Sequence, residues 1–450
     1  MLRPAVAAAR IARAAARRSG RGGGTTLPGR MLLRLEPDAI RALGARLEQG
    51  AVVVSATNGK TTTSGMLAGI LERAGRPIVH NRAGSNMNWG VATALLDAGR
   101  GPGELGLFEV DEAWLGPVAA DLRPRAYVLC NLFRDQLDRY GELERLADAW
   151  AEVVAARPPG SALVLNADDP LVADLGRDRE GVSYFGVEDD SHALGGLGHA
   201  ADSKHCRRCG AAYEYEAVYL GHLGRYRCPG CGRERPAPSV VARSIRLRGM
   251  SGSEFELTTP EASTRVTLPL PGLYNVYNAL AAAATATALG ASLSRIAEGL
   301  AATAAVFGRV EAVEVTGRKV WILLVKNPAG ANEVLRTLAL ESGPIDLWVG
   351  LNDGIADGRD VSWVWDADFE VLAGRTRHVT CSGTRAEEMA LRLKYAGVEA
   401  SPRVDRDLGR SLDAAVAEGD GPLFALPTYT ALLSLREELS RRGLAGRWSG

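Results

Sequence analysis

The stretch AVVVSATNGKTTT, residues 51–63, decides the fold. A short β-branched run ends at Val54, a Gly-Lys-Thr sequence follows, and apolar residues between 66 and 71 then recur at helical spacing. Strand, loop and helix in this order form a phosphate-binding site, because the N–H groups of the loop and of the helix N-terminus point at phosphate oxygens. Val54 occupies the first glycine position of the strict Walker pattern, which is therefore only half met. The stretch predicts an α/β protein that binds a nucleoside triphosphate.

The residue types of this loop suit the β- and γ-phosphates of ATP. Lys60 is expected to reach their oxygens, and the Thr61 hydroxyl is expected to hold Mg²⁺. Glu109 lies in the strand run of residues 107–110, and a carboxylate at the carboxyl end of a parallel strand faces the ligand crevice of an open sheet. Glu109 is therefore predicted to hold a magnesium ion between the γ-phosphate and an acceptor carboxylate. The predicted nucleotide-binding residues of the loop are Thr57, Asn58, Gly59, Lys60, Thr61 and Thr62.

Three residues farther along the chain are also predicted to bind the nucleotide. Asn275 and Asn278 carry amides suited to a purine edge, and Arg309 carries a planar guanidinium suited to phosphate oxygens. An Ala-rich helix begins near the two asparagines, so helix capping is the alternative role for them. The alternative for Arg309 is a solvated surface residue.

Four cysteines form a C-x₂-C, eighteen residues, C-x₂-C array inside a segment rich in Tyr, Gly and Arg. This spacing is typical of two knuckles that bring four thiolates to one zinc ion, and four sulfurs leave no open coordination position. The array predicts a structural zinc ribbon inserted at about residues 202–236. A nucleic-acid-binding module is the alternative, because the segment has basic and aromatic residues, although Glu214 and Glu216 reduce its positive charge. The predicted zinc ligands are Cys206, Cys209, Cys228 and Cys231.

The composition excludes a global attraction to nucleic acid or to an anionic membrane. The 450 residues are 46% hydrophobic, with 53 basic and 53 acidic residues. Only the Arg-rich, acid-free residues 1–24 stand out, and they predict a helix that lies on a protein or membrane surface or docks on its own domain. Cysteines in a zinc-type array favour a reducing cytoplasm, with peripheral contact at the inner face of the membrane left open. No apolar run is long enough for a membrane span.

The sequence T-N-G-K-T, residues 57–61, resembles the phosphate loop of the Mur ligase superfamily, ATP-dependent amide-forming enzymes. Ala56 replaces the glycine that is usual there. Further matches occur in the superfamily's order at residues 107–112, 131–140, 166–170, 272–279, 307–309 and 326–330. The resemblance implies a central P-loop domain with a parallel-rich sheet, a smaller C-terminal α/β domain, and ATP and Mg²⁺ as cofactors.

Three departures narrow the choice within the superfamily. The phosphate loop starts near residue 55, which leaves no room for a domain that grips a UDP-linked precursor. No lysine lies between Arg125 and Lys204, where many Mur ligases place a carbamylated lysine, and ordinary members lack the cysteine array. The MurT subfamily, the ligase subunits of lipid II isoglutaminyl synthases, is similar to the chain over nearly its full length, including residues 27–29 and 351–363.

This resemblance implies ATP-dependent amidation of the D-glutamate α-carboxyl of lipid II, with ammonia from a glutamine amidotransferase partner, GatD. It also implies that Asp360 completes a catalytic triad in that partner. The alternative is that Asp353, Asp357 and Asp360 cap turns in a Gly-rich loop. Three other functions stay open: a folylpolyglutamate-type ligase, a zinc-ribbon ATPase that binds nucleic acid, and a non-catalytic scaffold.

The predicted organisation has three parts. A basic helix and lead-in occupy residues 1–44, the central ATP-binding domain occupies residues 45–303 with the insertion at 202–236, and the C-terminal α/β domain occupies residues 304–450. The linker is expected at residues 303–309. Phosphates and acceptor are expected to meet in the cleft between the two larger domains.

Overall fold

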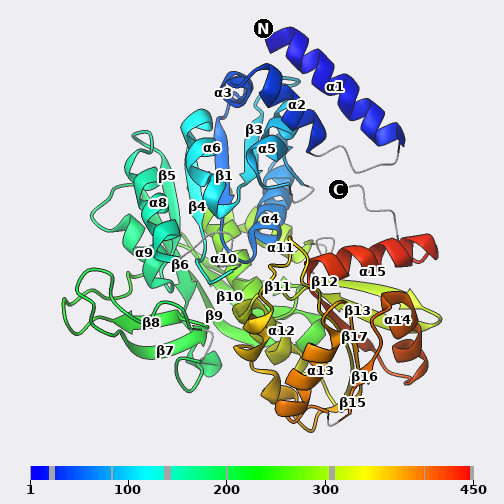
Figure 1. Cartoon of the computed structure of the whole chain (residues 1–450). Coiled ribbons are helices and arrows are strands. Elements are labelled where there is room, and N and C mark those ends of the chain that lie inside the picture. Colours follow the sequence, from blue (N-terminus) through cyan, green and yellow to red (C-terminus); the bar gives the residue numbers. More distant parts are fainter. Residues whose placement is uncertain are drawn as a thin grey trace.

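The computed structural model describes residues 2–19, 26–82, 85–135, 143–198, 201–303, 310–399 and 401–445. Two large sheets, each covered by helices on both faces, form the upper and lower right parts of the molecule in Figure 1. A two-stranded hairpin projects beside them at the lower left.

The first sheet has nine strands in the order β11-β10-β9-β6-β5-β4-β1-β3-β2. Seven neighbouring strands, from β9 to β2, run parallel, and β10 and β11 extend the edge antiparallel. This is the parallel-rich sheet that the sequence predicted. Its strands are β1 (Ala51–Ser55), β2 (Ile78–His80), β3 (Leu105–Glu109), β4 (Ala126–Leu129), β5 (Ala162–Asn166), β6 (Val182–Val187), β9 (Val240–Leu247), β10 (Ser253–Thr258) and β11 (Ser263–Leu268).

Alternation along β1 divides the core into two layers. Val52 and Val54 pack with α4 (Lys60–Arg73), α10 (Leu273–Ala288) and α11 (Leu293–Ala301) on one face, whereas Ala51 and Val53 pack on the other. The strand is buried on both faces and reads as a continuous apolar run, as parallel strands do. The helices of the second face are α1 (Leu2–Ser19), α2 (Leu27–Leu35), α3 (Ala39–Gly44), α5 (Asn88–Leu95), α6 (Leu115–Leu122) and α8 (Leu143–Ala155).

The second sheet has six strands in the order β12-β13-β17-β14-β15-β16, of which only β12 is antiparallel to its neighbour. It contains the three strand runs that the sequence predicted near residues 320, 346 and 422. Its strands are β12 (Val310–Val315), β13 (Arg318–Leu323), β14 (Ile345–Gly350), β15 (Thr376–Ser382), β16 (Arg403–Val404) and β17 (Leu423–Pro427). Its helices are α12 (Pro328–Leu338) and α13 (Ala386–Tyr395) on one face, and α14 (Leu408–Ala417) and α15 (Tyr429–Arg441) on the other.

The N-terminal helix docks on its own domain, one of the two roles that the sequence left open. Ala5, Val6 and Ala9 are buried in the core of the first sheet. Arg10 donates to the carbonyl of Leu96, and Arg13 makes two hydrogen bonds to Asp97, at 2.9 and 3.0 Å. No helix in the described part of the chain combines the length and the apolar character that crossing a bilayer requires.

The cysteine segment leaves the sheet after β6 and returns at β9, with the hairpin β7 (Glu214–Leu220) and β8 (Leu223–Arg227) between them. A short helix, α9 (Pro170–Ala173), lies beside it. Arg235 ties the segment to the sheet, because its guanidinium contacts Asp168, a fully buried carboxylate that also accepts from the hydroxyl of Tyr277 at 2.6 Å. The domain limits at 44 and 303 stay predictions, and most of the expected linker lies outside the described residues.

Candidate functional site

The phosphate loop joins β1 to α4 and touches α10. Gly59 has φ +87°, a conformation that favours glycine, and a Cβ atom there would lie 2.0 Å from Oδ1 of Asn278. Glycine therefore permits both the turn and the close approach. The amide of Asn278 accepts from the Thr63 hydroxyl at 3.3 Å, which joins the loop side of α4 to the start of α10.

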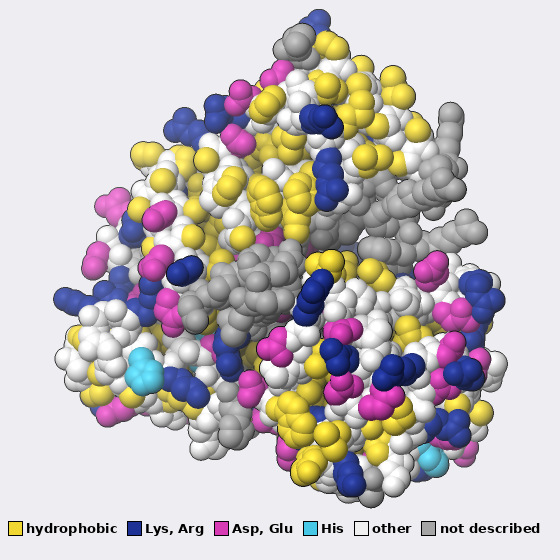
Figure 2. All heavy atoms as spheres, in the orientation of Figure 1, with side chains coloured by type: hydrophobic (Ala, Val, Ile, Leu, Met, Phe, Trp, Pro, Cys, Tyr) yellow, Lys and Arg dark blue, Asp and Glu magenta, His cyan; other side chains and the backbone are white. Residues whose placement is uncertain are grey.

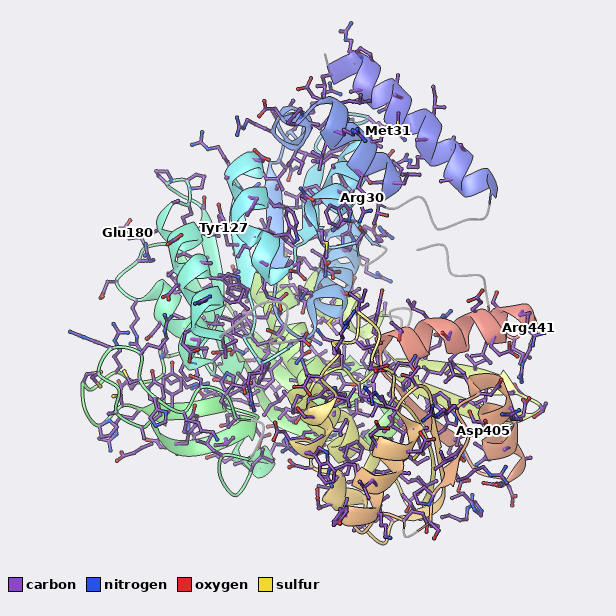
Figure 3. All side chains as sticks on the ribbon, in the orientation of Figure 1. Arg30, Met31, Tyr127, Glu180, Asp405 and Arg441 are labelled. Carbon is purple, nitrogen blue, oxygen red and sulfur yellow. The ribbon has the colours of Figure 1, made fainter. Side chains whose placement is uncertain are left out.

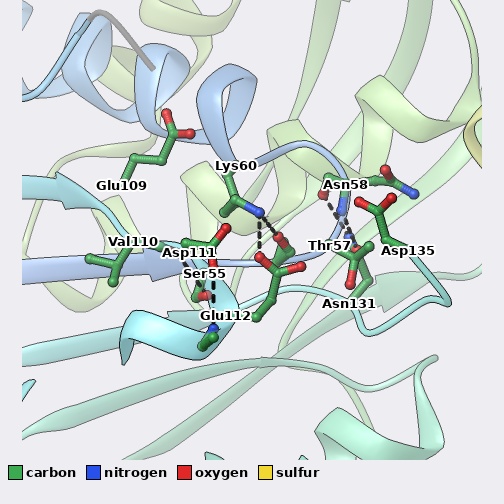
Figure 4. Close-up of polar contacts among 12 residues, drawn as sticks. Ser55, Thr57, Asn58, Lys60, Glu109, Val110, Asp111, Glu112, Asn131 and Asp135 are labelled. Atoms are coloured by element: carbon green, nitrogen blue, oxygen red, sulfur yellow. Dashed lines mark hydrogen bonds and ion pairs between the residues drawn. The ribbon is translucent and has the colours of Figure 1, made fainter. Parts of the chain in front are cut away.

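Lys60, the first residue of α4, is buried and engaged by a carboxylate. Its Nζ donates to Oε2 of Glu112 at 2.6 Å and also to the carbonyl of Ala56 (Figure 4). Burial alone would lower the pKa of Lys60, but Glu112 and other nearby carboxylates outweigh it, and the pKa is raised. Burial opposes ionisation of Glu112, yet the charge of Lys60 lowers its pKa below the ordinary value. The two form a buried ion pair, and sequence reasoning gave Glu112 no role.

Thr61 and Glu109 lie together, as the sequence predicted for a magnesium site. The Thr61 hydroxyl donates to Oε1 of Glu109 at 3.0 Å. The main chain of Glu109 exchanges two hydrogen bonds with the side chain of Asn81, at 2.8 and 2.9 Å, which fixes the end of β3. A threonine hydroxyl and a carboxylate are oxygen donors of the kind that Mg²⁺ takes beside substrate phosphates, so these residues fit the ion.

Asn131, which follows β4, holds the phosphate loop from a third side. Its amide accepts from the N–H of Asn58 and donates to the carbonyl of Asn58, both at 2.9 Å. Thr57 adds a second link, because its hydroxyl accepts from the N–H of Phe133 at 3.0 Å. The loop is thus fixed by the side chain of Asn131 and the main chain of Phe133, which lie 73 and 76 residues downstream of their partners. Sequence reasoning matched this segment to the superfamily only as a motif.

The C-terminal domain closes over the same loop. Asn327 and Asn58 exchange side-chain hydrogen bonds at 3.1 and 3.3 Å. Lys326 donates to the carbonyl of Thr57 at 3.1 Å and pairs with Asp135. These residues bring a second cation to the loop, and the sequence had quoted residues 326–330 without assigning them a role.

An apolar pocket adjoins the phosphate loop where the domains meet. Asn275 and Asn278 line it, and both are buried. Neither caps α10: its N-cap is Gly272, without a side-chain hydrogen bond, so the capping alternative is wrong. Arg309 lies outside the described residues, and its nucleotide contact remains a prediction. The pocket's apolar wall includes Phe133, Leu220, Leu223, Leu270, Tyr274, Val310, Leu324 and Val334.

Leu220 and Leu223 belong to the hairpin of the cysteine segment, so the insertion supplies one wall of this pocket. Both side chains are buried. We expect Leu223→Ala to raise the KM for ATP by about three- to tenfold and to change kcat little, because Leu223 lines the apolar pocket in which we expect the base, and not the phosphate loop. Steady-state kinetics at varied ATP measures this. Leu340→Ala, at an exposed position away from the pocket, is the control, and an unchanged KM in the Leu223 variant would remove the hairpin from the nucleotide site.

Asp360 lines a second pocket, together with Lys326, Trp363 and Asp366. It is exposed and accepts the N–H of Ser362 at 2.9 Å, a bond that lowers the pKa of Asp360. Its carboxylate is therefore ionised at neutral pH and caps a turn.

The two neighbouring aspartates have structural partners. Asp357 is buried and accepts from Thr430 and Gly354. Asp353 accepts from Thr384 and Arg385. The turn-capping alternative describes Asp357, which accepts the N–H of Gly354, but not Asp353, whose partners are side chains. Asp360 also caps a turn, and it is exposed at a pocket.

The four cysteines meet at one point. The sulfurs lie within 4.8 Å of one another, with 3.6 Å between Cys206 and Cys231 and 3.4 Å between Cys209 and Cys228. Tetrahedral zinc with sulfurs at about 2.3 Å places the sulfurs about 3.8 Å apart, so the arrangement fits the ion. The basic and aromatic residues nearby do not favour the nucleic-acid alternative. Tyr213 and Tyr226 are buried, and Arg225 and Arg227 pair with acids.

A serine at position 228 should remove zinc and lower stability. Cys228 is fully buried and its sulfur lies 3.4 Å from that of Cys209, so a serine there removes one of the four thiolates of the cluster. We expect about one zinc per wild-type chain by elemental analysis, and a loss of most zinc with a Tm lower by about 5 °C or more in Cys228→Ser. Cys381→Ser, at a buried thiol elsewhere, is the control and should keep its zinc. A metal-free wild-type protein of full stability would contradict a structural zinc.

Comparison with known proteins agrees with this geometry. A family model described as Mur ligase middle domain matches residues 54–226, and one described as MurT ligase C-terminal matches residues 324–432. The fold is similar to a pseudomurein peptide ligase type C from Methanothermus fervidus (TM-score 0.69, 24% identity, 89% of this chain and 80% of that one). It is also similar to MurF from Acinetobacter baumannii (TM-score 0.66, 19% identity, 92% and 80%). Fold and phosphate loop together define the class as Mur ligases.

Two sequence relatives narrow this class. Both are named lipid II isoglutaminyl synthase (glutamine-hydrolyzing) subunit MurT. The protein from Staphylococcus aureus (strain N315) is 33% identical over 438 residues, which cover 97% of each chain. The protein from Streptococcus pneumoniae (strain ATCC BAA-255 / R6) is 33% identical over 425 residues, 94% of this chain and 93% of the relative. The chain belongs to the MurT family.

Proposed function

We propose that this chain is the ligase subunit of a lipid II isoglutaminyl synthase. It amidates the α-carboxyl of D-glutamate in the lipid II peptide, with ATP as the energy source and ammonia from a glutaminase subunit, GatD. The observation that carries the proposal is the phosphate loop, in which Lys60 and the Thr61–Glu109 pair meet within a MurT-family chain. The full-length likeness to two MurT subunits supports this substrate over that of a folylpolyglutamate-type ligase.

The reaction has two steps. A carboxylate oxygen of the acceptor attacks the γ-phosphorus of ATP, ADP leaves, and an acyl phosphate forms. Ammonia then attacks the carbonyl carbon, the C–O bond to phosphate breaks, and the amide and inorganic phosphate are released. Magnesium, when bound by Thr61 and Glu109, would supply positive charge beside the phosphates.

The chain's own residues position the phosphates and balance their charge. Lys60 provides a permanent cation, because Glu112 and its neighbours raise the pKa of Lys60. The N–H groups of the loop and of the first turn of α4 face the phosphates, and Asn131 and Asn327 hold this loop in one shape. The apolar pocket beside Asn278 receives the base.

Ammonia must come from another subunit under this proposal. The two cysteines outside the cluster, Cys130 and Cys381, are buried, and burial raises the pKa of each thiol to about 12, which is unsuitable for a nucleophile. Asp360 is exposed and ionised, as a carboxylate must be to orient a histidine of GatD.

Co-expression with the partner tests the proposal. The product is expected to be lipid II about one dalton lighter, because an OH group becomes NH₂. Mass spectrometry of lipid II from cells with both subunits, with either subunit alone, and with the Lys60→Ala chain would measure it. An unchanged mass in every culture would overturn the proposal and would favour the scaffold alternative.

A further inference from the structure

Charge is divided very unevenly along this chain. Residues 1–35 contain eight arginines and no acidic residue, and Glu36 is the first acid. Since the whole chain has 53 basic and 53 acidic residues, residues 36–450 hold eight more acids than bases. The neutral total therefore hides a strongly cationic N-terminal segment.

The outward face of α2 mixes this charge with exposed apolar side chains. Leu27, Met31 and Leu35 follow one another at four-residue spacing and are 60%, 36% and 49% exposed. Arg30 and Arg34 are exposed between them. Figure 3 labels Arg30 and Met31 on this helix, and Figure 2 shows yellow and dark-blue side chains gathered where α1 and α2 lie. Such an amphipathic face suits contact with the headgroup region of a lipid bilayer.

The inward face of α2 fixes that orientation. Pro28, Gly29 and Leu32 are buried, and a Cβ atom at Gly29 would lie 1.8 Å from the carbonyl oxygen of Trp89 in α5. The guanidinium of Arg30 lies 4.6 Å from the ring centroid of Trp89, over which it stacks. Leu27, Met31 and Leu35 therefore cannot turn inward without breaking this packing.

Helix α1 extends the same surface. Its inner side is anchored through Arg13 and Asp97, while Ile11 is 71% exposed and Arg3 is also exposed. In such an arrangement the apolar side chains can enter the membrane interface, and the guanidinium groups of the neighbouring arginines can contact anionic headgroups.

We propose that the outward faces of α1 and α2 form a docking surface for an anionic lipid bilayer. Charge complementarity decides this occupant. The segment carries arginines and separate apolar side chains, and it has no acidic residue through residue 35. This combination suits a bilayer whose headgroups are negative and whose interior is apolar. The purpose of the docking rests on the proposed function, because an acceptor with a lipid anchor is confined to a membrane surface, whereas the docking itself does not depend on that function.

Vesicle binding tests this surface in the full chain, alone and with its partner. Co-sedimentation with vesicles of equal parts phosphatidylglycerol and phosphatidylcholine should exceed that with phosphatidylcholine alone, and it should weaken between 0.1 and 0.5 M NaCl. The double variant Met31→Glu, Leu35→Glu should bind the anionic vesicles about tenfold less well. Leu340→Glu with Leu391→Glu, 51% and 48% exposed in the C-terminal part, is the matched control and should bind normally.

Three results would overturn the proposal. The first is equal vesicle binding by the Met31, Leu35 variant and its control. Loss of partner binding in that variant would assign the surface to the partner, and a wild-type dimer that the variant dissociates would assign it to a second copy. A separate arm compares amidation of lipid II in vesicles with amidation of a soluble muropeptide. The variant should be slower only on vesicles. If the wild-type complex amidates neither acceptor, the proposed function fails, whereas the vesicle-binding result still decides the docking surface.

Discussion

Lys60→Ala is expected to slow amidation at least about a thousandfold, even with saturating ammonium chloride as the nitrogen source. Lys60 supplies a fixed positive charge where the transferred phosphoryl group gathers negative charge, and such a group acts mainly in the transition state. The loss should therefore fall on kcat. Release of inorganic phosphate in the presence of lipid II measures the first step, and amide formation measures the second.

The buried ion pair demands a specific control for this experiment. Alanine at position 60 leaves Glu112 buried without its cation, and an unpaired buried charge costs about 3–5 kcal/mol of stability. The variant could then lose activity by unfolding. Lys60→Met combined with Glu112→Gln removes both charges at similar volume and should recover most of the lost Tm without recovering activity. If the double variant amidates at near-normal rate, Lys60 is only a structural residue and the assignment of the phosphate loop is wrong.

Asp360→Asn should lower glutamine-dependent amidation about a hundredfold or more and leave ammonium-dependent amidation close to normal. An amide cannot balance the charge of an imidazolium that forms when a histidine accepts a proton from its nucleophile. The hydrogen bond that the structure gives the Asp360 carboxylate comes from Ser362 and not from the phosphate loop, so the ligase half-reaction should survive. Parallel assays with glutamine and with ammonium chloride on one preparation of the mutant complex give this ratio.

Asp366→Asn is the matched control, because Asp366 lines the same pocket and is also exposed on its side chain. It should leave both nitrogen sources equally effective. Size-exclusion chromatography must first show that each variant still binds the partner. Equal loss with both sources in Asp360→Asn would place this residue in the ligase site or in the fold, and full activity with glutamine would remove it from the mechanism.

Local patterns were sufficient for several features of this protein. The strand, the phosphate loop and the start of α4 are contiguous, so their hydrogen bonds and backbone angles depend on neighbouring residues. The spacing of the four cysteines likewise predicted a cluster that the structure forms, because each knuckle closes within a few residues. Thr61 and Glu109, both predicted to hold magnesium, lie in contact because parallel strands end at a common sheet edge, and the ion itself stays a prediction.

The capping alternative for Asn275 and Asn278 shows where local reasoning fails. Polar residues near a helix start are good caps in general, but here α10 begins at Leu273. Asn275 lies in its first turn and donates to the carbonyl of Pro271, and Asn278 lies in the second turn and accepts from the Thr63 hydroxyl. The N-cap is Gly272, three residues before Asn275, and this position of the helix start decided between a cap and a pocket wall. Helix limits are the least predictable part of a pattern.

The sequence by itself determined the nucleotide loop, the cysteine cluster, the two sheets and the family. Only the tertiary structure decided the partners of those groups. Glu112 pairs with Lys60 across 52 residues, Asn327 meets Asn58 across 269, and Leu223 of the cysteine segment lines the apolar pocket beside the phosphate loop. No sequence pattern encodes these contacts, because each depends on how separate elements pack. The packing of separate elements also set the orientation of α2. Because Gly29 packs tightly against Trp89, the apolar residues on the opposite side of α2 face outward.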